Sequence, residues 1–393
     1  MWAPVRAGGS RWPVQLRRAH LGSIAAGPAR PSRRGRCASP LLPPKGVPAC
    51  RYDGPPVQFP DVSPRAFLRI TQVTVVIVVI NIVTGAAVRL SDSGLGCPDW
   101  PTCSQHSLTP QLSLHPAIEF GNRMVVVVLC IATALAVLAA ARRAPRRRDL
   151  VWLSAGLLGG VIGEAVLGAV VVYTKLNPYV VMTHFMVGIA LLTDAFVLAL
   201  RAGRPDGGGT ATSKVGRRER RIGQAMVGLL VVVIAAGTAT TGAGPHAGGK
   251  GAKRLPIALE EMARIHSGIV ISLVALTVAL LYLLDHTGAP ASVLERARVL
   301  LGAMVLQGGI GYVQYFTHLP ALLVGVHVFG ATVVWMAMLW FYDGLTHHPA
   351  LRPEDAVSGS AGTLGNSRPG GIGDGGTTSA PSMGPRPATP VSP

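Results

Sequence analysis

Eight long apolar runs constrain the fold of this chain more than any other feature. Each is roughly 18–25 residues long, which as a helix is enough to cross the hydrocarbon core of a bilayer. The backbone groups of such a segment must bond to one another, because the bilayer core holds no water. The sequence therefore predicts an all-α membrane protein with eight transmembrane helices, over 66–88, 118–141, 150–174, 179–200, 222–242, 262–284, 297–316 and 320–343.

The net charge of +18 would suit a nucleic-acid partner, but the placement of the charge favours a membrane-topology signal. Residues 1–65 carry eleven Lys/Arg against two acids, and most other basic residues lie in short connectors. The connectors 141–149 and 201–221 are strongly basic, so we expect them and both termini to face the cytoplasm. We expect a multi-pass cell-membrane protein in contact with lipid and not with nucleic acid. The outward loops are then 89–117, 175–178, 243–261 and 317–319, of which 243–261 is a local exception with three basic residues.

Both ends of the chain lack apolar periodicity. Residues 1–64 are rich in Arg, Pro and Gly, and residues 344–393 are of low complexity, so both are predicted to be disordered. No short apolar core precedes a small-residue cleavage site, so no signal peptide is visible. The basic arm is open to three interpretations: a mitochondrial transit peptide, cytoplasmic anchoring charge, or an over-extended start. Its Pro/Gly-rich, non-amphipathic composition favours the last two.

The eight predicted spans form two copies of a four-helix unit. The segment 163–192 resembles 306–335, since each has a glycine sixteen residues before a histidine, a Thr-x-Leu and a proline between them. Four helices separate the copies, so both have the same orientation and are related by a pseudo-twofold axis along the membrane normal. The domains expected are a first half, 65–201, with the outer loop 89–117; a cytoplasmic linker, 202–221; and a second half, 222–343.

The repeat exposes four equivalent positions near the outer ends of the predicted helices. His266 and His327 occupy two of them in the second half, and His184 occupies one in the first half. The fourth position is Asn122, since 122 to 266 is an offset of 144 and 184 to 327 is an offset of 143. The topology places all four at one depth.

A histidine inside a membrane span is costly and is usually functional. Two histidines at equal depth on alternate helices suit the axial ligation of a haem iron, because imidazole nitrogen is a common haem ligand and bundle interiors hold such cofactors. The alternative is a histidine hydrogen-bonded to a neighbouring helix, which the half-wise repetition disfavours. No span carries the HxxxH, HExxH or carboxylate cluster of a bare metal site.

Three further features lie at the outer end of the first half. Cys97 and Cys103, on the oxidising side, can close a small disulfide ring. Glu119 shares a helical face with Asn122 and is either a proton-handling group, with its pKa raised by partial burial, or a solvated interfacial acid. Arg123 either pairs with a haem propionate or extends to the membrane surface. Glu164, deep in its span, corresponds to Gln307 in the repeat; its role is either a helix–helix hydrogen bond or a functional one.

These residues resemble a known family. The segments "TGAAVRLSDSGLGCPDWPTC" (84–103) and "EFGNR" (119–123), with the three histidines, resemble the haem A synthase family of bacterial, cysteine-pair type, over about 66–343. The resemblance implies an enzyme that oxidises the C8 methyl of haem O to the formyl of haem A, by successive hydroxylations, for a terminal oxidase. It implies haem O as substrate, and we expect a haem O synthase and an unidentified electron partner beside it.

The resemblance also implies roles for residues. A haem b cofactor would lie between His266 and His327, the first half would receive haem O, and Glu119 would be catalytic. Cys97 and Cys103 would form a disulfide. The sequence departs from the family pattern at Asn122, where the usual motif has histidine, so His184 would be the single iron ligand of the first half and Asn122 a hydrogen-bonding group.

Two other classes of function are open on the residues alone. A membrane b-type cytochrome that only transfers electrons would use the same histidines, but it does not explain why one half has a complete pair and the other an incomplete pair with Glu119. A transporter built from parallel repeats would place its polar residues near the midplane and not at one face.

Overall fold

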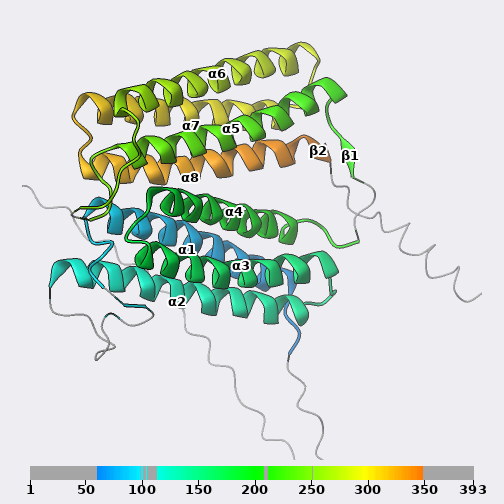
Figure 1. Ribbon diagram of the computed structural model, residues 1–393. Helices are drawn as coiled ribbons and strands as arrows, with labels where there is room; N and C mark the ends of the chain where they lie inside the picture. Colours follow the sequence, from blue (N-terminus) through cyan, green and yellow to red (C-terminus); the bar gives the residue numbers. More distant parts are fainter. Residues whose placement is uncertain are drawn as a thin grey trace, which may run out of the picture. The chain divides into compact units, whose positions relative to one another are not determined.

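The computed structural model describes residues 60–97, 99–100, 103, 113–207, 211–249 and 251–347. Eight helices in these residues are long and apolar enough to cross a membrane, and each coincides with a predicted span. The predicted all-α membrane fold is therefore confirmed (Figure 1). The helices are α1 Pro64–Leu90, α2 Leu114–Ala141, α3 Arg148–Tyr173, α4 Pro178–Ala202, α5 Arg217–Ala243, α6 Leu259–His286, α7 Ala291–Phe316 and α8 Ala321–Gly344.

The helices form two four-membered rings, one for each half of the sequence. In the first half α1 packs on α2, α2 on α3, α3 on α4, and α4 closes the ring on α1; α5 to α8 repeat this order. The two rings meet through α1, α4, α5 and α8 (Figure 1). One contact across this interface is the hydrogen bond of 2.9 Å that Trp335 Nε1 donates to Thr193 Oγ1. The observed arrangement is therefore the predicted one, two tandem four-helix bundles.

Several helices begin before the predicted spans. α5 begins at Arg217, so residues 217–221 of the predicted linker are helical, and α7 begins six residues before the predicted start at 297. The reason is that apolar content marks the depth of the lipid, whereas Arg and Glu are good helix formers and continue the helix beyond it.

A small sheet was not predicted. Strand β1 (Thr212–Ser213) in the connector pairs antiparallel with β2 (Thr346–His347), which follows α8. Residues 344–347, predicted as disordered tail, therefore end α8 and form β2. At the other end of the chain, Val62 bridges to Arg143 and α1 begins at Pro64. Most of the predicted disordered tails, 1–59 and 348–393, lie outside the described residues.

The connectors with basic residues are held by carboxylates. Arg143 is 2% exposed, and its Nη2 donates to both oxygens of Asp206, at 2.8 and 2.9 Å. Arg204, just after α4, pairs with Asp343 near the end of α8. A buried guanidinium needs such a partner, because an unpaired charge removed from water is costly. These pairs fix the same end of both halves.

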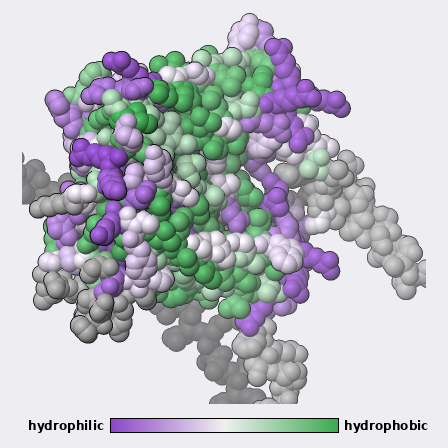
Figure 2. All heavy atoms as spheres, viewed as in Figure 1, coloured by the Kyte–Doolittle hydropathy of each residue, from purple (hydrophilic) through white to green (hydrophobic). Residues whose placement is uncertain are grey.

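The outer surface of the helices is apolar. Figure 2 shows hydrophobic residues over the middle of the visible face and hydrophilic residues toward the two ends. Exposed aromatic side chains lie near helix ends, as in the aromatic belts of membrane proteins. These are Trp152, Tyr173, Tyr179, Tyr282 and Phe316. The surface is that of a multi-pass membrane protein.

Candidate functional site

The four equivalent positions lie at matching places in the two rings. Asn122, His184, His266 and His327 are each six to eight residues after the first residue of α2, α4, α6 and α8 respectively. α2 and α4 are alternate helices of the first ring, and α6 and α8 are alternate helices of the second. All four side chains are half-buried. The structure therefore places the predicted residues on alternate helices at one end of each ring.

Each of the four side chains lies against a glycine of the preceding helix. A Cβ added at Gly237 or Gly311 would be 3.1 Å from Cε1 of His266 or His327 respectively. At Gly168 the corresponding distance to His184 Cε1 is 3.6 Å. A Cβ added at Gly85 would be 4.0 Å from Asn122 Oδ1. The glycines thus leave room for an imidazole beside the helix backbone. In the sequence, the sixteen-residue spacing from Gly168 to His184 and from Gly311 to His327 indicated the repeat; the structure shows that it also marks these two contacts.

The tautomer of His266 is fixed by its neighbour. Its Nδ1 lies 3.1 Å from the backbone carbonyl of Val233 in α5. A carbonyl oxygen only accepts, so Nδ1 carries the proton and Nε2 keeps its lone pair. This is the orientation in which histidine binds a metal, with its other nitrogen bonded to a carbonyl or carboxylate.

His327 has a different neighbour. Among the described residues, Nδ1 of His327 has no hydrogen-bond partner. Gln307 in α7 instead donates from Nε2 to the backbone carbonyl of His327, at 2.8 Å. The second ring of helices therefore has two imidazoles on alternate helices, at matching places near one end.

The first ring is different at both positions. His184 Nδ1 is 3.1 Å from Oε1 of Glu164 in α3. Asn122 is linked to α1, because Thr84 Oγ1 lies 2.7 Å from Asn122 Oδ1 and can donate to it. The ring thus offers one imidazole and one amide. In the described part of the chain, no three or more His, Cys, Asp or Glu residues gather as a bare metal site would require.

Glu119 is enclosed by described residues of the loop between α1 and α2. It is 5% exposed, so the alternative of a solvated interfacial acid is wrong. Its Oε2 accepts from the backbone N–H of Cys97, at 2.8 Å, and its Oε1 accepts from Arg123 Nη2, at 2.6 Å. Cys97 is disulfide-bonded to Cys103, as predicted. One end of the disulfide ring therefore orients the carboxylate.

Arg123 binds the loop as well as Glu119. Its Nη1 donates to the carbonyl of Asp99, at 2.8 Å, so the guanidinium is held inside and does not extend to the membrane surface. Gly96 allows the loop to approach α2, since a Cβ there would be 2.7 Å from the carbonyl carbon of His115. The loop, the disulfide, Glu119 and Arg123 form one cap over the start of α2.

Arg89 joins the two halves and was missed as a structural residue. At the end of α1, its Nε donates to the carbonyl of His246, at 2.9 Å, and its Nη2 to that of Thr241, at 3.0 Å. Nearby, Gly94 N–H donates to Gly248 O, at 2.9 Å. The cap is thereby bound to the second half, and only the pairing of loops far apart in sequence could have shown it.

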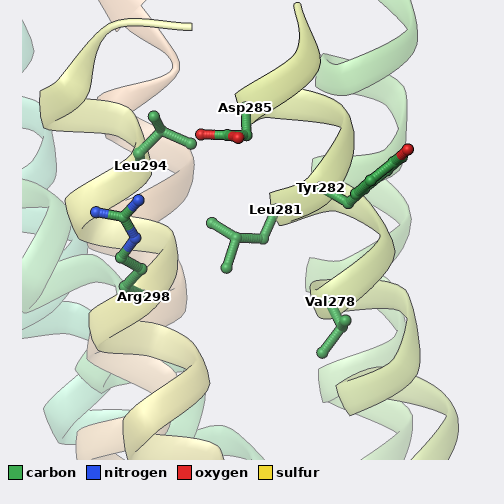
Figure 3. A pocket seen from close by; sticks show the side chains of 6 residues that line it. All are labelled: Val278, Leu281, Tyr282, Asp285, Leu294 and Arg298. Carbon is green, nitrogen blue, oxygen red and sulfur yellow. The ribbon is translucent and has the colours of Figure 1, made fainter.

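A separate cavity of about 300 Å³ lies between α6 and α7. Figure 3 shows Asp285 and Leu281 of α6 on one side of it and Leu294 and Arg298 of α7 on the other. Its lining begins twelve residues after His266, about 18 Å along the helix at 1.5 Å per residue. None of the four equivalent positions lines it, so it is not the site described above.

Comparison with known proteins shows that residues 68–116 and 113–248 match the model of the family COX15-CtaA, cytochrome oxidase assembly protein. These residues contain the cap, Asn122 and His184. Proteins named "Heme A synthase" are similar to the chain in Geobacillus kaustophilus (36% identity over 131 residues), Geobacillus thermodenitrificans (35% over 127) and Shewanella oneidensis (32% over 152).

These alignments cover part of each chain. They include 32%, 31% and 33% of this chain and 40%, 39% and 44% of the respective relatives. The chain thus matches less than half the length of these relatives. Over the matched residues, the resemblance to the haem A synthase family is confirmed.

Proposed function

We propose that this protein is a haem A synthase, because residues 68–248 match the model of the COX15-CtaA family of cytochrome oxidase assembly proteins. In this reaction the C8 methyl of haem O is oxidised to the formyl of haem A. The observation that carries the proposal is that the family match includes Glu119 and His184, together with the disulfide loop that orients the carboxylate.

We propose that the second half holds haem b between His266 and His327. Two observations support this ligand pair. The proton on His266 Nδ1 leaves Nε2 free for iron, and Gly237 and Gly311 leave room beside the helix backbone for the imidazoles of His266 and His327. Bound there, haem b would supply one-electron transfer. The chain's own contribution is to fix both imidazoles at one depth and to surround them with apolar helices.

The first half is the proposed site of the substrate haem O, with His184 as its single histidine ligand. Asn122 is a poor ligand for iron, and its bond to Thr84 gives it a position as a hydrogen-bonding side chain. Arg123 is assigned to holding the cap and Glu119, because its contacts with the loop use the guanidinium that a propionate would need.

Glu119 is proposed as the catalytic residue. Two successive hydroxylations convert the methyl to a geminal diol, and loss of water from the diol leaves the formyl group. This loss moves a proton from one hydroxyl of the diol to the other, which departs as water; a buried and oriented carboxylate is suited to accept that proton from the first hydroxyl and pass it to the second. The N–H of Cys97 and the guanidinium of Arg123 hold the carboxylate in one orientation. The Cys97–Cys103 disulfide keeps that N–H in place.

We further propose that the cap faces outward and both termini face the cytoplasm, on the basis of the basic connectors 141–149 and 201–221. A haem O synthase supplies the substrate in this account, and a separate electron partner acts at the second half. A b-type cytochrome without substrate conversion is not favoured, because it gives no role to the enclosed Glu119 or to the incomplete ligand pair beside it.

Purified protein supplied with haem O and a reductant in air tests the proposal. We expect the recovered haem to gain one oxygen and lose two hydrogens, as the conversion of methyl to formyl requires. Glu119→Ala should abolish this change. Glu261→Ala, an exposed acid in the first turn of α6, is the matched control and should retain it. Unchanged haem O with the wild-type protein, or full conversion by Glu119→Ala, would refute the assignment.

A further inference from the structure

The contact between α3 and α4 places a carboxylate where the corresponding contact of the second half has the amide of Gln307. Side chains and glycines alternate along this contact: His184 lies against Gly168, and Glu164 against Gly188, where an added Cβ would be 3.4 Å from Glu164 Oε1. Small residues allow two membrane helices to approach closely. Glu164 is 8% exposed, so a carboxylate is enclosed directly beside the histidine.

The contact of 3.1 Å between His184 Nδ1 and Glu164 Oε1 is not an aligned hydrogen bond, because the N–H of Nδ1 does not point along it. Contacts of this kind are often misaligned until the ligand is bound. Glu164 Oε2 has no hydrogen-bond partner among the described residues, so the carboxylate has no competing contact there.

The repeat provides an internal comparison. Glu164 corresponds to Gln307, with the same offset of 143 that relates His184 to His327. Gln307 bonds to the backbone carbonyl of His327 and not to the ring, and the ring of His266 bonds to a neutral carbonyl. Of the three histidines, only His184 lies beside an acidic side chain in an ion-pair contact within the described residues.

We propose that Glu164 is a positioning residue that holds His184 through Nδ1 and makes its Nε2 an electron-rich ligand of the substrate haem. This rests on the proposed function, since it takes the first half as the site of haem O. A carboxylate beside Nδ1–H fixes the tautomer and raises the basicity of the other nitrogen. Greater electron donation stabilises the oxidised iron, which strengthens a site that has one histidine in place of two.

The test uses the full chain with His266→Ala and His327→Ala, so that both proposed haem b ligands of the second half are removed. Haem O is bound to this protein, reduced, and examined by resonance Raman spectroscopy for the iron–histidine stretching mode. We expect Glu164→Gln to lower the frequency of this mode, to raise the reduction potential, and to weaken haem affinity on the order of 10- to 100-fold.

Three variants keep the result interpretable. Asp194→Asn removes another carboxylate of the α3/α4 contact, which lies 3.4 Å from a Cβ added at Gly156, and should leave the mode unchanged. Glu164→Asp retains the charge and should keep much of the wild-type frequency of the iron–histidine mode. It therefore tests the proposal even where Glu164→Gln folds poorly. His184→Ala should remove the mode. An unchanged frequency and affinity in Glu164→Gln, or a mode that survives His184→Ala, would overturn the proposal.

These measurements need no turnover. A wild-type protein that makes no haem A, while Glu164→Gln lowers the frequency, would end the proposed function and leave the role of Glu164 standing. Haem A formation by the wild type, with an unchanged frequency in Glu164→Gln, would support the proposed function and end the proposed role of Glu164.

Discussion

Replacing Gly311 by alanine tests whether the space that Gly311 leaves beside α7 determines the position of the His327 imidazole. The new Cβ would lie 3.1 Å from His327 Cε1 and 3.6 Å from its Nδ1. Carbon atoms in favourable contact are about 3.5–4.0 Å apart, so the imidazole must move by roughly half an ångström. Both groups belong to packed helices, and a forced shift of this kind costs about 1–3 kcal/mol. If that cost falls on the bound state, haem affinity decreases roughly 5- to 150-fold.

The assay is titration of the purified protein with haem b, together with the absorption spectrum of the reduced complex. Gly308→Ala is the matched control on the same helix, because a Cβ at that position meets nothing within 4 Å. We expect it to bind haem like the wild type. Wild-type affinity and an unaltered spectrum in Gly311→Ala would refute the reasoning, since the position of the His327 imidazole would then not depend on the space beside Gly311.

The remaining predictions concern the cap and the ligands. Cys97→Ser with Cys103→Ser should lower haem A formation by about tenfold or more, since losing one oriented hydrogen bond to a charged group costs about 1.5–3 kcal/mol; activity that is unaffected by the double change would contradict the role of the loop. Arg89→Met should lower the thermal stability of the protein, because the carbonyls of Thr241 and His246 lose their donor; an unchanged midpoint of thermal unfolding would argue against it. His327→Ala should remove bound haem b while leaving the helical circular dichroism intact, and a full haem complement would exclude His327 as a ligand.

The sequence was sufficient to predict the eight helices and the four equivalent positions. Apolar length identifies a membrane helix because the bilayer sets a fixed thickness, and a repeated helical unit places equivalent residues at equal depth. It was also sufficient for the Cys97–Cys103 disulfide, since two cysteines in a short outer loop leave few alternatives. These features are local, or follow from a periodicity that the chain repeats.

The contacts between distant loops could not be predicted in this way. Arg89 reaches carbonyls more than 150 residues later in the chain, and nothing in its surroundings identifies those acceptors. The enclosure of Glu119 depends on how the loop folds back on α2, which a helical-face argument does not include. Glu164 was left with two roles because only the packing of α3 against α4 brings its carboxylate to His184.

The most direct test of the central claim is the mass of the haems extracted from cells that have no haem A synthase of their own and that express a haem O synthase with this chain. The account predicts haem A only when the chain is present, and its loss in Glu119→Ala. Extracts that contain haem b and haem O but no haem A, from cells in which the chain is folded and inserted in the membrane, would contradict it.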